Sequence, residues 1–168
     1  GYFPKGGFDP IVRPVVDTSK VSCIGYDVGG SICLYSAAFD KRINAVGSIA
    51  GFAPLRTDSY ESTGGIERLW SWYAMMPRLG FYKDNQKAIP YDFDDVLEMI
   101  APISTLVYAP MNDIGANVTD VLDITKVAQE AWHKLNADGN FTVMTPNDYS
   151  RLQKNQITDI ITWLKKIW

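Results

Sequence analysis

A short bend between an apolar run and a run of small residues places narrow limits on the fold of this chain. Residues 21–26 form the apolar run and predict a buried strand, and residues 32–39 predict a helix. Between them the sequence reads Gly-x-Asp-x-Gly-Gly, with Asp27 at its centre. Small neighbours allow a strand and a helix to approach each other closely. We therefore expect Asp27 to be displayed at a tight turn, near the amides that begin the helix.

Further apolar runs predict three more strands, and helical patterns lie between them. The strand candidates are residues 43–50, 103–109 and 141–144. Apolar stripes at helical spacing cover residues 121–135 and 157–167. Alternating strands and helices predict an α/β domain whose parallel sheet is covered on both faces. We expect this domain to span residues 20–168, after an irregular lead-in of residues 1–19 that is rich in glycine and proline.

Residues 51–102 differ from the rest because they hold much of the aromatic content. Two amphipathic pieces have helical spacing: Ile66, Leu69, Trp70, Tyr73, and then Phe93, Val96, Leu97, Ile100 with Asp92 as the N-cap. We expect the segment to cap the carboxyl ends of the strands, where α/β sheets bind ligands. Its arginines, Arg56, Arg68 and Arg78, are candidates for an anionic group or for ordinary surface and ion-pairing roles.

Composition and charge exclude several classes of partner. The net charge is −3 and no basic run occurs, so we expect no nucleic-acid or membrane partner. No apolar stretch of about 18 residues is present, and no signal peptide is visible, which leaves the compartment open. Cys23 and Cys33 lie in apolar surroundings and predict two reduced, buried thiols. No histidine stands near them, so we expect no metal and no cofactor.

Several segments together resemble one branch of a known family. They are residues 24–31, 37–42, 48–52, 64–69, 77–81, 107–113 and 145–149. In these segments the chain resembles the dienelactone-hydrolase and acetyl-xylan-esterase branch of the α/β-hydrolases. The resemblance covers about residues 20–168 and implies the C-terminal half of an α/β-hydrolase fold. That half would hold about four parallel strands flanked by helices, with a helical cap insertion at about residues 51–102.

The resemblance also assigns candidate site residues. Asp27 takes the nucleophile-elbow position, where the family has serine, and Asp113 takes the acid position in the loop after the third strand. Tyr26, Val28, Trp70 and Tyr73 are the expected binding residues. The family's histidine lies in the loop after the last strand, but residues 143–148 contain none. The single histidine, His133, falls in the long helix, where we expect a solvated or structural role.

These departures bear directly on the chemistry. A carboxylate at position 27 carries no proton for a base to remove, so Asp27 cannot run the serine esterase mechanism. Without the histidine, the usual base for water attack is missing as well. The sequence also begins just before the elbow strand, so the family's earlier strands and one oxyanion donor are not in it. We therefore expect a non-catalytic relative, a pseudoenzyme that binds a small-molecule ligand or a partner.

Two active alternatives stay open. Haloalkane dehalogenases and epoxide hydrolases resemble the chain at Gly-x-Asp-x-Gly-Gly and use the aspartate as nucleophile. In that case the aromatic residues Trp70, Trp72, Tyr73 and Tyr82 would bind the halide or activate the epoxide, although helical spacing also fits cap core. A second alternative is a hydrolase whose missing parts come from another chain or another region.

Two further expectations concern the carboxylates and the sheet edge. Asp27 is expected to be held by the amides at the helix start, and Asp113 either to bind its own loop or helix or to be a relic of the site. The strand that begins at Val21 would lose one neighbour in this half of the fold. Because a bare apolar edge promotes aggregation, we expect it to be covered by a second copy, a companion chain or residues 1–19.

Overall fold

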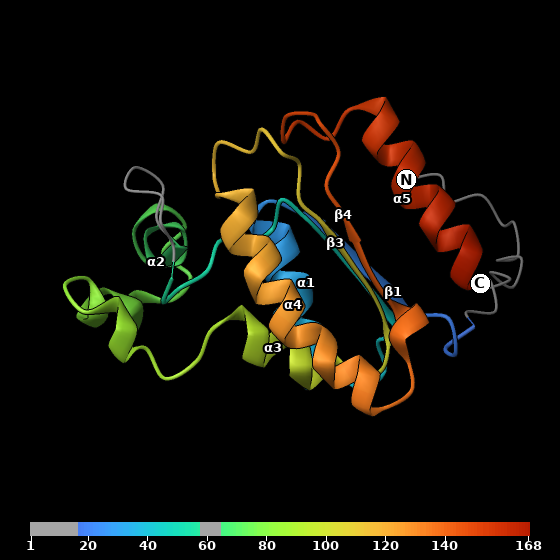
Figure 1. Ribbon diagram of the computed structural model, residues 1–168, viewed down its shortest axis with the longest axis horizontal. Helices are drawn as coiled ribbons and strands as arrows, with labels where there is room; N and C mark the ends of the chain where they lie inside the picture. The colour runs from blue at the N-terminus through green and yellow to red at the C-terminus, as the bar shows by residue number, and fades with distance from the viewer. Residues whose placement is uncertain (1–16, 58–64) are drawn as a thin grey trace, which may run out of the picture.

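The protein contains a four-stranded parallel sheet, seen here in a computed structural model that describes residues 17–57 and 65–168 (Figure 1). The strands lie in the order β1 (Ser22–Tyr26), β2 (Ala45–Ile49), β3 (Ser104–Tyr108) and β4 (Phe141–Met144). Tyr26 pairs with Ile49, and Ile49 pairs with Tyr108, so the carboxyl ends of these three strands are level. The predicted α/β architecture is confirmed, with strand ends within about two residues of the sequence-based ranges.

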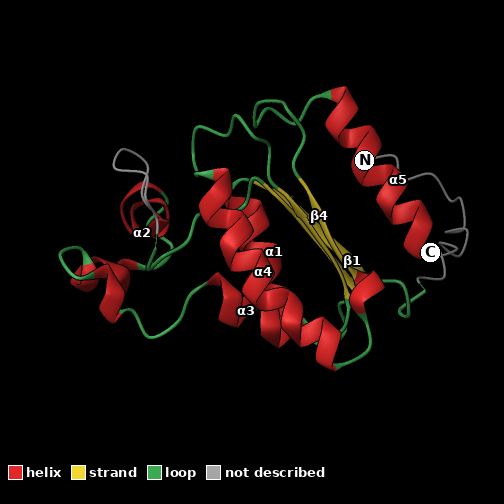
Figure 2. Cartoon of the chain, viewed as in Figure 1, coloured by secondary structure: helices red, strands yellow, loops and turns green. Residues whose placement is uncertain are grey.

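Helices cover both faces of the sheet. The four longer ones are α1 (Val28–Phe39), α3 (Phe93–Ile100), α4 (Val118–Lys134) and α5 (Lys154–Ile167). Figures 1 and 2 show α1, α3 and α4 on one face and α5 alone on the other. β2 is buried along its whole length, as expected for a parallel strand with helices on both sides. The two faces carry separate apolar clusters, the larger under α1, α3 and α4 and the smaller under α5.

The segment expected to form a cap divides into two parts. Its second part, α3, packs against α1 and α4 and so belongs to the main helical layer. The N-cap prediction at Asp92 is confirmed: this fully buried carboxylate accepts hydrogen bonds from the amides of Leu55, Arg56 and Phe93 at 2.7–2.8 Å. These bonds tie the start of α3 to the chain that follows β2.

The first part of the segment consists of short helical pieces. They are α2 (Gly65–Glu67), the π-helix η1 (Arg68–Trp72), and the 3₁₀ turns η2 (Pro77–Tyr82) and η3 (Gln86–Ala88). A third 3₁₀ turn, η4 (Asp138–Asn140), lies before β4. The single amphipathic helix predicted from Ile66 to Tyr73 is therefore wrong. The amide of Tyr73 bonds to the carbonyl of Arg68, five residues back, and this wider turn shifts the side chains that follow it.

One edge of the sheet is open within the described part of the chain. β1 pairs with β2 on one side, and no strand of residues 17–57 or 65–168 lies on the other. Ile24, near the middle of β1, is 36% exposed. The predicted lead-in falls almost wholly on residues 1–16, which lie outside the described residues. Across the described ranges, no helix has the length and apolar character needed to cross a membrane.

Candidate active-site cleft

The predicted tight turn at Asp27 is present between β1 and α1. Asp27 has φ 52° and ψ −126°, a strained backbone conformation for a residue other than glycine. A Cβ at position 25 would lie 2.0 Å from the carbonyl oxygen of Gly29, and one at position 30 would lie 2.7 Å from the Cα of Gly51. Glycine is therefore required at both positions for the strand, the helix and the chain after β2 to approach so closely.

The carboxylate of Asp27 is held by two side chains. The guanidinium of Arg68 donates to Oδ1, and the hydroxyl of Tyr73 donates to Oδ2 at 2.6 Å. The side chain makes no capping hydrogen bond at the start of α1. The expectation that helix amides hold Asp27 is therefore wrong. The reason is a cation 41 residues away in the sequence, which the π-helix η1 brings to the elbow.

Arg68 is fixed from three directions. Besides Asp27, its guanidinium donates to the carbonyl of Ala50, after β2, and to that of Gly115, after β3, at 3.1 and 3.0 Å. Its side chain is only 7% exposed, whereas that of Asp27 is 37% exposed. Arg68 thus takes the ion-pairing role rather than that of a free anion receptor. The carboxylate of this pair faces the solvent, and the guanidinium stays in the protein.

Two tyrosines beside the elbow stay protonated at neutral pH. Burial, followed by the hydrogen bond to Asp27, raises the pKa of Tyr73 above its ordinary value. Burial, followed by the charges of Asp27 and Asp113, raises the pKa of Tyr26. The Tyr26 hydroxyl donates to the backbone carbonyl of Ser150. Both phenols are therefore hydrogen-bond donors at this site.

Asp113 binds its own loop and the loop after β4. Its Oδ1 accepts from the amide of Gly115 and from the hydroxyl of Ser150, both at 2.8 Å. Ser150 lies in the loop where the resemblance places a histidine. The two loops are also joined through their backbones, from Asn112 to Asp148 at 3.0 Å. Ser150 was not predicted from the sequence. The one signal available for it was its position in the loop after the last strand.

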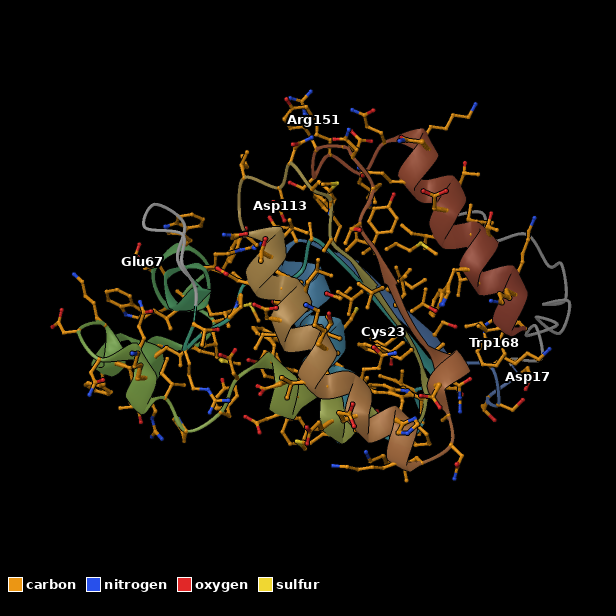
Figure 3. All side chains as sticks on the ribbon, viewed as in Figure 1. Asp17, Cys23, Glu67, Asp113, Arg151 and Trp168 are labelled. Carbon is orange, nitrogen blue, oxygen red and sulfur yellow. The ribbon has the colours of Figure 1, made fainter. Side chains whose placement is uncertain are left out.

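These groups surround a cleft of about 230 Å³. It is lined by Tyr26, Asp27, Ala50, Arg68, Trp72, Tyr73, Asp113, Ile114, Gly115 and Ser150. Figure 3 shows Asp113 in the loop beyond the carboxyl ends of the strands, the place where parallel α/β sheets bind ligands. The structure brings together four of the predicted site residues, namely Asp27, Asp113, Tyr26 and Tyr73.

The other two predicted binding residues lie outside this cleft. The indole of Trp70 packs over the backbone of Gly80, with the ammonium of Lys83 5.8 Å from its ring centre. Trp72 takes the expected place of Trp70, because the π-helix changes which side chains face the elbow. Val28 borders a separate small void of about 10 Å³, which Arg68 and Tyr73 also line.

The histidine is remote from this chemistry. His133 lies exposed in the last turn of α4, and its Nδ1 is 3.0 Å from Asp138 Oδ1. Its surface role agrees with the sequence-based expectation. Within the described ranges, no group of three or more His, Cys, Asp or Glu side chains is arranged to hold a metal ion.

Comparison with known proteins identifies the fold. No protein-family model matches the sequence, and neither does any curated protein. A glucuronoyl esterase of carbohydrate esterase family 15 from Caldicellulosiruptor kristjansonii superposes with a TM-score of 0.73 at 16% identity, covering 91% of this chain and 44% of that one. The glucuronoyl esterase catalytic domain from Hypocrea jecorina gives a TM-score of 0.70 at 18% identity, covering 90% and 45%. An α/β-hydrolase from a Penicillium species gives 0.58 at 16% identity, covering 92% and 66%.

The chain has an α/β-hydrolase fold. It spans less than half the length of the glucuronoyl esterases that it matches. Its four parallel strands form part of the α/β-hydrolase sheet, with the elbow at the carboxyl end of β1. Since these likenesses lie at 16–18% identity, they establish the fold and leave the activity to be argued from the cleft.

Proposed function

We propose that this α/β-hydrolase-fold chain binds a ligand in the cleft without hydrolysing esters. The observation that supports this most directly is the state of Asp27, both of whose carboxylate oxygens accept hydrogen bonds from protein side chains. A carboxylate neutralised by Arg68 is a poor nucleophile, and it has no proton to give to a base. The chain's single histidine is engaged at the end of α4, so no imidazole activates water in the cleft.

The walls of the cleft favour a neutral ligand rich in hydroxyl groups, such as a carbohydrate. Trp72 and Tyr73 are both exposed and offer aromatic faces, and Asp27 and Asp113 offer oxygen acceptors. The cleft contains two carboxylates and one guanidinium, that of Arg68, so its net charge is negative and disfavours an anionic ligand. Several matched structures are described as carbohydrate esterases. We propose that the chain belongs to the dienelactone-hydrolase and acetyl-xylan-esterase branch, on the segments that carry the sequence resemblance.

Catalysis is tested with activated and natural-type esters. We expect the chain to hydrolyse 4-nitrophenyl acetate and the methyl ester of glucuronic acid no faster than buffer. The Asp27→Ser variant should also stay at background, because it gains a hydroxyl but no base. Release of 4-nitrophenol well above the buffer rate by the unaltered chain would contradict the proposal. So would a covalent adduct on Asp27, detected by intact mass after incubation with an alkyl halide or an epoxide.

Binding is tested by titration calorimetry with neutral xylose oligomers. We expect saturable binding that weakens about two- to tenfold in Trp72→Ala, since one aromatic contact contributes roughly 0.5–1.5 kcal/mol. Trp70→Ala is the matched control, because Trp70 lies outside the cleft, and it should bind like the unaltered chain. Absence of saturable binding, or equal weakening in both variants, would rule out the carbohydrate assignment.

The open edge of β1 supports a proposal about assembly. We propose that a strand from a companion region pairs with this edge, since the matched structures extend well beyond the matched region. Such pairing would satisfy the outward backbone groups of β1 and cover Ile24. A chain that sediments as a monomer at high concentration, without aggregation and without any partner, would contradict this.

A further inference from the structure

Two cysteines meet across the elbow. Cys23 lies on β1 and Cys33 on α1, so the pair brackets Asp27 in the sequence. Their sulfur atoms are 2.7 Å apart. Non-bonded heavy atoms rest at about 3.5–4 Å, and a disulfide bond is about 2 Å long. Figure 3 labels Cys23 beside the sheet. The two thiols are thus placed for a bond to form with only a small movement of either side chain.

The two sulfur atoms differ in access. Cys33 is 6% exposed and belongs to the larger apolar cluster, whereas Cys23 is half-buried at the margin of that cluster. Burial, and then the contact with Cys23, raises the pKa of Cys33 to about 12. The Cys33 thiol therefore remains protonated and out of reach of solvent reagents. A reaction with an external oxidant has to begin at Cys23.

We propose that Cys23 and Cys33 form a reversible disulfide, with a small organic disulfide such as oxidised glutathione as the oxidant. The Cys23 thiolate attacks one sulfur of the oxidant, which releases one thiol and leaves a mixed disulfide. Cys33, after giving up its proton, attacks the Cys23 sulfur and releases the second thiol. The two cysteines lose two electrons and two protons in total, and the organic disulfide is reduced to two thiols.

The bond would fix the elbow mechanically. It ties the strand before Asp27 to the helix after it and closes a loop of about ten residues, which removes conformational freedom from the unfolded chain. The sequence predicted two reduced, buried thiols. Both are free in the structure, but only Cys33 is buried, because Cys23 lies at the margin of the apolar cluster; the proposal adds an oxidised state. This modification site involves neither Arg68 nor the cleft residues, so it stands independently of the proposed ligand.

The experiment equilibrates the folded protein with reduced and oxidised glutathione, stops the exchange with acid, and alkylates the denatured chain with iodoacetamide. Under oxidising conditions we expect a monomer that is about 2 Da lighter than the reduced, unalkylated chain and has no alkylated cysteine. Under excess dithiothreitol we expect two alkylated cysteines. If the oxidised sample retains two alkylated cysteines, a stable glutathione adduct or a disulfide-linked dimer, the proposal is overturned.

Single variants test the order of the steps. Cys33→Ser should accumulate glutathione on Cys23, because nothing resolves the mixed disulfide. Cys23→Ser should leave the buried Cys33 unmodified in the folded state. The opposite labelling pattern would overturn the proposed route. Urea unfolding of the unaltered chain supplies a second readout: the oxidised form should have an unfolding equilibrium constant about a hundredfold lower than the reduced form. Equal unfolding equilibrium constants for the oxidised and reduced forms would overturn the proposal that the disulfide constrains the chain.

Discussion

The Arg68→Met variant is expected to lose about 3 kcal/mol of folding free energy, measured by urea unfolding. The substitution leaves the Asp27 carboxylate without its cation and removes the donors to the carbonyls of Ala50 and Gly115. A buried ion pair broken on one side costs roughly 3–5 kcal/mol. The lower end applies here, because the Asp27 side chain remains 37% exposed and solvent can take over part of its charge.

Two controls separate the ion pair from the loss of the long side chain. Arg78→Met makes the same change at an exposed arginine of the same segment and should alter stability by less than about 0.5 kcal/mol. Combining Arg68→Met with Asp27→Asn removes the uncompensated charge and should recover about 1 kcal/mol relative to Arg68→Met alone. If the double variant is as unstable as the sum of the single ones, the charges are not coupled as the geometry indicates.

The Trp132→Ala variant is expected to lose about 4 kcal/mol, the largest effect of any single change discussed. Trp132 is fully buried in α4, its ring stacks on Phe141 of β4 at 4.4 Å, and its indole N–H donates to the carbonyl of Ile103 at 3.1 Å. Alanine would leave a large cavity between the helix and the sheet and would remove the indole donor to the carbonyl of Ile103, which keeps only the hydroxyl of Thr105 as a donor.

Trp168→Ala serves as the comparison for Trp132→Ala. Trp168 is 45% exposed at the end of the chain and donates to the Ser22 hydroxyl at 3.0 Å. Its loss should cost less than about 1 kcal/mol. Similar destabilisation of both variants in urea unfolding would mean that α4 and β4 do not form the tight contact described above.

The elements of the main sheet were accessible from the sequence because their signals are local. Apolar runs fixed the positions of β1 to β4, and helical stripes fixed α4 and α5. The turn at Asp27 was equally predictable, because the glycines that permit it, Gly25 and Gly30, lie within three residues of it. The sequence alone could therefore predict that the elbow and the loop after β3 lie together at the carboxyl ends of the strands.

The partners of Asp27 could not be predicted, because they depend on tertiary structure. Arg68 stands 41 residues away, and nothing in its neighbours distinguishes it from a surface arginine. A regular helix was the natural reading of residues 66–73, and it pointed to Trp70. The π-helix turns Trp72 toward the cleft instead. Local periodicity contains no information on an inserted residue in a turn, and this explains why Trp70 was predicted in place of Trp72.

The anchoring of Arg68 sets the direction in which this site can change. We expect its guanidinium to keep its bonds to the carbonyls of Ala50 and Gly115 when residue 27 is changed, because neither bond involves that residue. A small uncharged residue there would leave a fixed cation at the base of the cleft, with room in front of it. One substitution at the elbow would then convert a wall that repels carboxylates into a receptor for them, and the backbone need not move.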